Sequence, residues 1–288
     1  GIDIKYKDIY LSALTKQINS TYKNEKIKTL YIGGGTPSLL NVNDIKNIIK
    51  HFNFENDSEI TLEVNPETVE ETKFHKIKEI GINRISLGVQ SFNDSILRNI
   101  GRNHTKKNIL ESVEIIKKCG FENINIDLIY GLPNQNTDLI KKDIEQSLNL
   151  GIHHISTYGL KIEKESFFGK NPPRNLPNDE QQADMYIALC SELTLNGFEH
   201  YEISNYAKDG MMSIHNKNYW LNGDYYGFGL GSVSYLDSYR ISNTKNMNKY
   251  LDNEYLMNSE YEDINIRKEN DLILGLRLIE GINYRIFN

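Results

Sequence analysis

A repeated unit of helix, glycine, apolar residue and strand restricts the fold of this 288-residue chain more than any other feature. The glycine–apolar junctions are Gly81-Ile82, Gly120-Phe121, Gly151-Ile152 and Gly197-Phe198. Glycine after a helix adopts the left-handed conformation without steric cost, and the apolar residue that follows packs against the last turn. Apolar residues in a helical stripe precede the junctions, as at Ile109, Val113 and Ile116. The chain therefore alternates helices and strands.

The segments between these helices are short and rich in β-branched residues. We expect strands over residues 29–32, 60–64, 84–89, 124–129 and 155–160. Because helices separate them, they should pair in parallel through right-handed crossovers. Five such units suit a (β/α) barrel or an open doubly wound sheet, and no dinucleotide-binding fingerprint follows the first strand. We favour a barrel, complete or incomplete.

The character of the sequence changes beyond about residue 200. The helix–strand repeat stops, tyrosines become frequent, and Gly227, Gly229 and Gly231 alternate with apolar residues. Alternating glycines predict closely approached strands or tight loops. We expect a smaller α+β region here, so the predicted domains are residues 1–199, the barrel, and residues 200–288, the C-terminal region.

Composition excludes several classes of protein. The formal net charge of −6 argues against nucleic acid as the main partner, because phosphate binding needs a basic surface. Two cysteines exclude a disulfide framework and cannot by themselves build a four-ligand zinc or iron–sulfur site. No signal peptide opens the chain, and no apolar run approaches the roughly twenty residues that span a bilayer. We expect a cytoplasmic protein without a membrane span, and leave peripheral membrane association open.

Polar residues stand at the ends of four successive predicted strands: the turn 33–37 (GGGTP), Glu63, Gln90 and Asp127. The carboxyl ends of barrel strands meet at one mouth, where such barrels hold their active sites. Bare glycine backbone suits a phosphate or the charged groups of an amino acid, and Gln90 and Asp127 suit ribose hydroxyls. Glu63 can accept from an ammonium, and the fork of Arg102 suits a carboxylate. The set predicts a pocket for a zwitterion joined to a nucleoside, although any single member can instead cap a loop.

Several motifs carry a resemblance to a known family. They are residues 31–38 (YIGGGTPS), 63–66 (EVNP), 88–92 (GVQSF) and 127–133 (DLIYGLP). With them the chain resembles the oxygen-independent coproporphyrinogen III oxidase-like family of radical S-adenosylmethionine (SAM) proteins. Residues 201–207 (YEISNYA) and 215–220 (HNKNYW) are similar to its HemW haem-chaperone branch. The resemblance extends over nearly the whole chain.

The resemblance implies an α/β fold with a partial, TIM-type (β/α)6 radical SAM barrel and a smaller C-terminal α+β region. It also implies roles for individual residues. The SAM-binding set would be Gly34, Gly35 and Thr36 at the methionine end, the pocket glutamate Glu63, the nucleoside contacts Gln90 and Asp127, and Arg102 near the methionine carboxylate. His215 would be a ligand of haem iron, since imidazole is a usual axial donor.

One departure from the family pattern concerns the cluster. The family places a CxxxCxxC loop after its first strand to hold a [4Fe–4S] cluster, and this chain has only Cys119 and Cys190. We expect both to be packed thiols, so the chain supplies no cluster ligands and should not cleave SAM as it stands. We expect a protein that lacks its ends in this sequence; a homologue that lost the cluster is the alternative.

Three functions follow as hypotheses. The first is a haem chaperone that binds haem and delivers it to an acceptor protein, with SAM and a [4Fe–4S] cluster in the intact protein. The second is an oxygen-independent coproporphyrinogen III oxidase, and the third is a cluster-free barrel enzyme acting on a phosphorylated metabolite. His215 could instead donate to a backbone carbonyl beside an aromatic core. Whether the protein is an enzyme, its haem acceptor and its oligomeric state stay open.

Overall fold

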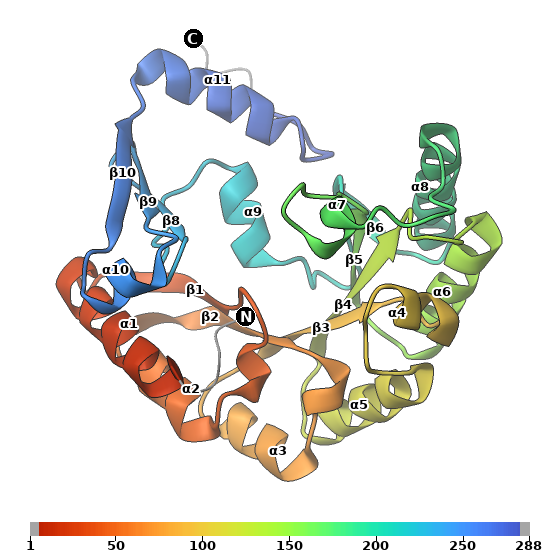
Figure 1. The fold of residues 1–288 in the computed structure, drawn as a ribbon, viewed down its shortest axis with the longest axis horizontal. Helices are drawn as coiled ribbons and strands as arrows, with labels where there is room; N and C mark the ends of the chain where they lie inside the picture. The colour runs from red at the N-terminus through yellow and green to blue at the C-terminus, as the bar shows by residue number, and fades with distance from the viewer. Residues whose placement is uncertain (1–5, 283–288) are drawn as a thin grey trace. The chain divides into compact units, whose positions relative to one another are not determined.

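The computed structural model describes residues 6–282 (Figure 1). The chain divides into two compact units. Unit 1 comprises Gly1–Leu30, Leu40–Glu59 and Ser213–Asn288. Unit 2 comprises Tyr31–Leu39 and Ile60–Met212. The division into domains 1–199 and 200–288 stays a prediction.

A seven-stranded sheet in the order β1-β2-β3-β4-β5-β7-β6 organises unit 2, with the ends of β1 and β2 inside this unit. Its strands are β1 (Lys26–Ile32), β2 (Asn53–Val64), β3 (Arg84–Gln90), β4 (Asn123–Tyr130), β5 (His154–Gly159), β6 (Glu199–Glu202) and β7 (Asn205–Ala207). The pairs β2–β3, β3–β4 and β4–β5 are parallel, as the helix–strand repeat predicts.

Helices connect these strands, most of them on the outer side of the sheet and α7 (Phe167–Lys170) on its inner side (Figure 1). They are α3 (Glu71–Glu79), α4 (Asp94–Asn99), α5 (Lys106–Lys118), α6 (Thr137–Asn149), α7 (Phe167–Lys170) and α8 (Asp179–Leu195), with 3-10 turns at Pro37–Leu39 and Pro66–Thr68. All four predicted glycine junctions adopt positive φ, from 58° at Gly151 to 102° at Gly81. The apolar residue after each glycine is buried, so this helix-ending signal is confirmed.

The strand that follows β5 in the sheet is antiparallel, unlike the parallel strand that a continued helix–strand repeat would place there. The strand after α8 does not pair with β5; β7 pairs antiparallel with β5, and β6 pairs antiparallel with β7. The reason lies in the turn between β6 and β7, where the Ser204 carbonyl accepts from the Thr157 N–H at 2.7 Å. Residues 201–207 thus fold back as a hairpin on the edge of the parallel strands.

The strands of unit 2 carry two chemically different faces. Ile85, Leu87, Ile126 and Ile155 are completely buried on one face, where each contributes roughly 1.5–3 kcal/mol of apolar burial. The alternate residues are polar, because side chains of a strand point to opposite faces in turn. The register aligns four of them in one row across the sheet: Glu63, Ser86, Asn125 and His154.

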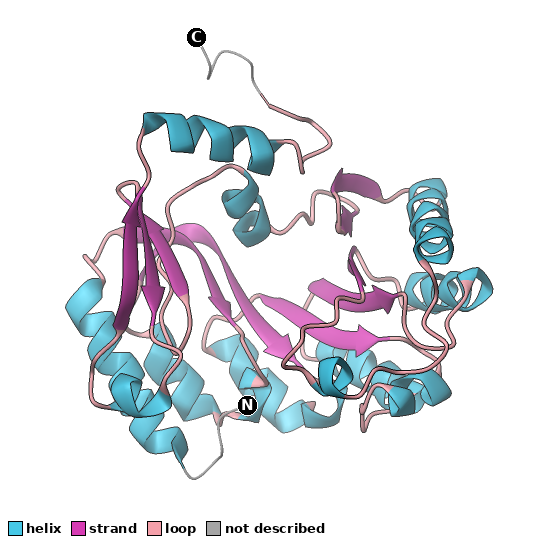
Figure 2. Cartoon of the chain, turned by 45° about the horizontal axis from the view of Figure 1, so that its top comes forward, coloured by secondary structure: helices cyan, strands magenta, loops and turns pink. Residues whose placement is uncertain are grey.

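Unit 1 holds the other helices and a three-stranded antiparallel sheet, the left-hand group of strands in Figure 2. Its elements are α1 (Lys7–Thr21), α2 (Val42–Ile49), α9 (Ile214–Trp220), α10 (Met247–Leu251), α11 (Ile264–Gly275), β8 (Val233–Leu236), β9 (Tyr239–Asn243) and β10 (Leu256–Tyr261). A Cβ at Gly227 would lie 2.0 Å from the Val233 carbonyl oxygen, which confirms the close backbone approach predicted for the alternating glycines. Between residues 6 and 282 no helix has the length and apolar character needed to cross a membrane.

Candidate functional site

The glycine turn after β1 is tied to the end of β2. The Gly34 N–H donates to Glu63 Oε2 at 3.0 Å, and Asn65 Nδ2 donates to Thr36 Oγ1 at 3.0 Å. A Cβ at Gly33 would lie 2.7 Å from Glu63 Cδ, so only glycine fits beside that carboxylate. The two predicted strand ends therefore form one assembly.

The same turn faces open space on its other side. Gly34 and Gly35 are exposed, and a Cβ at either position would meet nothing within 4 Å. Gly34 has a φ of 87°, which glycine adopts freely. The turn thus offers bare backbone to a ligand while Glu63 holds its shape from behind.

Tyr31, the first residue of the motif 31–38, joins this assembly, although it was not among the predicted ligand-binding residues. Its hydroxyl donates to Glu63 Oε1 at 2.9 Å. Burial, and then the neighbouring carboxylates of Glu63 and Asp127, raise the pKa of Tyr31. Glu63 lies opposite Ser86 in the register of β2 and β3, and Ser86 Oγ donates to Asp127, so the two carboxylates lie on the same face of the sheet.

Asp127 stands on the polar face of β4. Its carboxylate accepts from Asn125 Nδ2 at 2.8 Å and from Ser86 Oγ at 3.3 Å. Burial raises the pKa of Asp127 to about 6, the bond from Asn125 and the charge of Arg84 oppose that rise, and Glu63 adds to it. Around neutral pH the group is therefore mainly an ionised acceptor, which suits the hydroxyls of a sugar.

Gln90 ends β3 in a strained conformation. Its φ is 68°, in the left-handed region, and the pairing of β3 with β4 shifts register just before it. Its amide lies over Gly88, where a Cβ would be 3.1 Å from Gln90 Nε2 and 3.4 Å from Asn65 Oδ1. Strain of this kind at a buried polar residue is typical of functional sites, and it places Gln90 beside the β2 end.

The turn that follows Gln90 is held from behind by Asp143 of α6. Its carboxylate accepts from the Phe92 N–H at 2.7 Å and from Ser91 Oγ at 2.8 Å. Asp143 was not singled out from the sequence. The signal available was an acidic residue on the apolar stripe of its helix, next to Ile140 and Ile144.

Arg102 is not brought into this group. It follows α4, and its N–H donates to the Leu97 carbonyl at 2.9 Å. Within residues 6–282 no hydrogen bond or ion pair joins its guanidinium to the glycine turn, Glu63, Gln90 or Asp127. Its role at a ligand carboxylate stays a prediction.

His215 lies in unit 1, on α9, with both ring nitrogens engaged. Thr29 Oγ1 of β1 lies 2.8 Å from Nδ1, and the Tyr219 hydroxyl lies 3.0 Å from Nε2. Both partners are side-chain hydroxyls. The alternative to haem ligation in the sequence analysis was a hydrogen bond from His215 to a backbone carbonyl, which is not what these two contacts are. The Tyr219 ring packs edge-on at 5.1 Å between centroids.

Glu59 of β2, another residue that the sequence did not single out, anchors α9. Its carboxylate accepts from the N–H groups of Ile214 and His215, both at 3.1 Å, and from Ser213 Oγ at 3.3 Å. Such charge-assisted bonds at the free N–H groups of a helix start are strong. These bonds fix the start of α9, and with it the motif 215–220, to β2.

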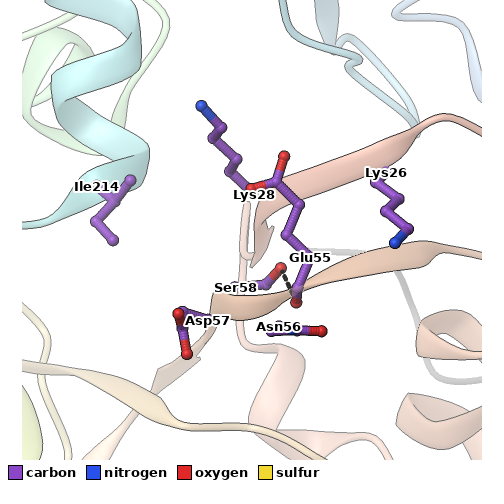
Figure 3. A pocket seen from close by; sticks show the side chains of 7 residues that line it. All are labelled: Lys26, Lys28, Glu55, Asn56, Asp57, Ser58 and Ile214. Atoms are coloured by element: carbon purple, nitrogen blue, oxygen red, sulfur yellow. Dashed lines mark hydrogen bonds between the residues drawn. The ribbon is translucent and has the colours of Figure 1, made fainter.

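A separate pocket of about 410 Å³ opens in unit 1 (Figure 3). Its lining residues are Lys26, Lys28, Glu55, Asn56, Asp57, Ser58 and Ile214. Two lysines and two acids give it charges of both signs. None of the predicted SAM or haem residues lines it, so this pocket is distinct from the group in unit 2.

The two cysteines are packed thiols. Cys119 is buried at the end of α5, its Sγ lies 3.6 Å from the Glu71 carbonyl, and burial raises the pKa of the thiol. Cys190 Sγ lies 3.0 Å from the Tyr206 hydroxyl. Across residues 6–282 no group of three or more His, Cys, Asp or Glu side chains could hold a metal ion. The described side chains do not fit a [4Fe–4S] cluster.

Comparison with known proteins adds the family context. Residues 4–146 match the family model of the radical SAM superfamily. The chain is 38% identical over 285 residues to the heme chaperone HemW of Lactococcus lactis, covering 96% of this chain and 75% of that protein. It is 36% identical over 296 residues to the heme chaperone HemW of Bacillus subtilis, covering 97% and 78%.

Among solved structures, coproporphyrinogen III oxidase (HemN) of Escherichia coli, described as a radical SAM enzyme, superposes with a TM-score of 0.85 at 24% identity. The match covers 96% of this chain and 70% of that chain. It confirms the predicted fold class, an α/β fold with a partial barrel and a smaller C-terminal α+β region.

Proposed function

The chain belongs to the HemW family of the radical SAM superfamily, and from this premise we propose that it is a haem chaperone, which binds haem and delivers it to an acceptor protein. One observation carries the proposal. Relatives named heme chaperone HemW are 36–38% identical over 96% or more of this chain. Haem and a haem-acceptor protein, met in the cytoplasm, are the partners that follow.

We further propose that unit 2 binds SAM in the intact protein. The donor set suits that ligand: open glycine backbone at Gly34 and Gly35, a carboxylate at Glu63, and an ionised acceptor at Asp127. Gly34, Gly35, Thr36 and Glu63 would hold the methionine end, Gln90 and Asp127 the ribose, and Arg102 the carboxylate. SAM supplies one-electron chemistry when it is bound beside a reduced cluster.

This chain's own residues bind and orient. Glu63 fixes the glycine turn, Tyr31 keeps its proton because burial and the two carboxylates raise the pKa of its hydroxyl, and Asp127 accepts at the nucleoside side. The [4Fe–4S] cluster of the intact protein is part of the proposal, but these side chains do not supply its ligands.

For haem, we propose His215 as the axial ligand. The hydrogen bond between Thr29 and Nδ1 would fix the ring orientation, as a second partner usually does for a ligating histidine. Nε2, which now contacts the Tyr219 hydroxyl, would be the atom that holds the iron.

Haem titration tests this assignment. His215→Ala should abolish or strongly shift the haem absorbance spectrum, because it removes the axial nitrogen. His75→Ala, at an exposed site on α3, is the matched control and should leave the spectrum as in the wild type. An unchanged spectrum for His215→Ala removes this residue from the site.

Calorimetry tests the SAM assignment. In full-length protein, Asp127→Ala should weaken SAM binding by about 1–3 kcal/mol, since a buried hydrogen bond to a charged group is lost. Asp138→Ala, at an exposed acid on α6, serves as the control. Equal affinities for the wild type and Asp127→Ala would refute the ribose contact.

Oxidation of coproporphyrinogen III is the alternative, and the fold likeness to HemN is the observation behind it. Anaerobic turnover of coproporphyrinogen III by intact protein would favour that enzyme over the chaperone. A cluster-free barrel enzyme is the second alternative. Phosphate bound at residues 33–35, without SAM affinity in intact protein, would favour it.

A further inference from the structure

A buried polar chain runs behind Asp127 through unit 2. The Tyr201 hydroxyl lies 2.8 Å from His154 Nε2, and His154 Nδ1 lies 2.6 Å from Asn125 Oδ1. Asn125 Nδ2 in turn donates to Asp127 at 2.8 Å. His154 is fully buried, Asn125 is 2% exposed and Tyr201 is 4% exposed. None of these three residues belongs to the SAM set proposed above.

The donor and the acceptor of each hydrogen bond in this series are set by the ionisation of Asp127. An ionised carboxylate only accepts, so Asn125 must present its Nδ2 to Asp127 and its Oδ1 to His154. Oδ1 also accepts from Ser156 Oγ at 3.0 Å. His154 Nδ1 therefore carries a proton, which leaves Nε2 as the acceptor of the Tyr201 O–H.

The charge state of His154 agrees with that assignment. Burial, and then the charge of Arg84, hold the pKa of His154 well below its ordinary value. The ring is therefore neutral, with a single proton on Nδ1. Since Arg84 can only donate, its approach to Nδ1 at 3.5 Å is proximity and not a hydrogen bond.

Asn125 acts on two donors to the carboxylate, its own amide and Ser86. One Nδ2 proton goes to Asp127 Oδ1, and the other goes to Ser86 Oγ at 2.9 Å. Because Ser86 Oγ accepts that proton, its own proton is directed to Asp127 Oδ2 at 3.3 Å. A rotation of the Asn125 amide would therefore disturb both oxygens at once.

We propose that Tyr201, His154 and Asn125 act as positioning residues, which fix the Asp127 carboxylate in the orientation that binds the ribose hydroxyls of SAM. The inference rests on the proposed SAM site and names residues that hold it. It also gives a role to the motif 201–207. Its first tyrosine is the terminal donor of the chain, on the hairpin that flanks β5.

Other charged and titratable groups face Asp127 from neighbouring strands. They are Tyr31 of β1, Glu63 of β2, Arg84 of β3, and His154 and Tyr158 of β5. Of these groups, Arg84 and Glu63 carry charge and act on Asp127 through space, whereas Asn125 acts through an oriented bond. Because the His154 ring is neutral, a change at His154 leaves both charges in place and isolates the oriented bond.

The first experiment needs no ligand. The Asp127 carboxyl is titrated by carbon-13 NMR in wild type, His154→Phe and His154→Asn. The phenylalanine removes the donor to Asn125, whereas asparagine restores an N–H near the Nδ1 position. We expect His154→Phe to raise the pKa of Asp127 by about one unit, because Asn125, without its partner at His154, no longer holds the oriented bond that favours the charged form of Asp127. His154→Asn should return it to the wild-type value.

The second experiment measures binding of S-adenosylhomocysteine to the same variants by calorimetry. His154→Phe should weaken affinity about fivefold to thirtyfold, and His154→Asn should recover most of it. His153→Phe, at an adjacent and more exposed histidine, is the matched control. Nitrogen-15 NMR of the wild type should show the Nδ1–H tautomer of His154.

The outcomes separate the two proposals. A wild type that binds no adenosyl compound counts against the SAM site, while the carboxyl titration still tests the chain behind Asp127. A folded His154→Phe with an unchanged Asp127 titration, or an Nε2–H tautomer in the wild type, overturns the positioning role. If His154→Phe does not fold, Tyr201→Phe takes its place in the carboxyl titration: a raised pKa of Asp127 supports the chain, and an unchanged one contradicts it.

Discussion

Replacing Asp143 by Asn should make the stability of the protein less dependent on pH. Asp143 is 2% exposed and accepts from Phe92 and Ser91. Burial raises its pKa from 3.8 to about 6, against those two bonds and the charge of Lys106. The folded state therefore holds this proton to higher pH than the unfolded chain does.

The sign and size of the effect follow from that difference. The stability contributed by the protonated group is fully present below the unfolded pKa of 3.8 and is lost as pH rises through about 6. A rise of about two units corresponds to about 3 kcal/mol in all, of which about 2 kcal/mol is lost between about pH 4.5 and pH 8. Asn carries no charge, so the variant escapes this loss.

Scanning calorimetry of wild type and Asp143→Asn at both ends of that range is the assay. The difference in Tm, variant minus wild type, should increase by about 4–8 °C when the pH is raised from about 4.5 to about 8. Hydrogen exchange at the Phe92 amide, which donates to Asp143, measures the stability of unit 2 in particular. Asp138→Asn, at an exposed acid on the same helix, is the control. Parallel Tm curves for the wild type and Asp143→Asn would show that the carboxyl titrates normally, and would refute the reasoning.

Two further substitutions probe the two units separately. Gly33→Ala should displace Glu63 from the glycine turn and lower SAM affinity about tenfold or more, because its Cβ would lie 2.7 Å from the Glu63 carboxyl carbon. Asp138→Ala, at an exposed acid on α6 outside the proposed site, should bind as the wild type in the same calorimetric titration. Glu59→Ala should loosen α9 and destabilise unit 1 by about 2–4 kcal/mol, since three donors lose their acceptor. Urea unfolding monitored by the fluorescence of Trp220, the one tryptophan of the chain, measures it, and a midpoint equal to that of the exposed control Glu55→Ala would contradict the anchoring role.

The parallel strands and the meeting of their ends could be predicted from the sequence, because both follow from local signals. A glycine after each helix fixes where a strand begins, and parallel strands bring their carboxyl ends to one edge. That logic predicts the glycine turn, Glu63 and Asp127 at one edge. In the structure the turn is hydrogen-bonded to Glu63, and Glu63 lies opposite Ser86, which donates to Asp127; the ligand that they would hold stays a prediction. The same logic could not place Arg102, whose position depends on the loop after α4 and not on strand register.

The polar residues behind the site were missed although a signal was present. Asn125 and Asp127, or His154 and Ser156, are two residues apart in strands whose intervening positions are apolar. Side chains two apart share a face, so this alternation predicts a polar face in an otherwise buried sheet. His154 resembled its neighbour His153 in sequence. Only the register, which sets His154 opposite Asn125, distinguishes the two.

The buried polar face of the sheet is not explained by its contribution to stability. Arg84, Asn125 and His154 are at most 2% exposed, and burying such groups costs free energy unless every hydrogen-bonding atom is matched. Well-packed apolar residues at the same positions would often give equal or greater stability. A sheet that keeps amide, imidazole and hydroxyl groups in register beneath Asp127 is therefore better explained by the orientation they impose on that carboxylate than by stability. On this argument, variants that keep the donor at His154 should preserve binding even where they lower the unfolding free energy.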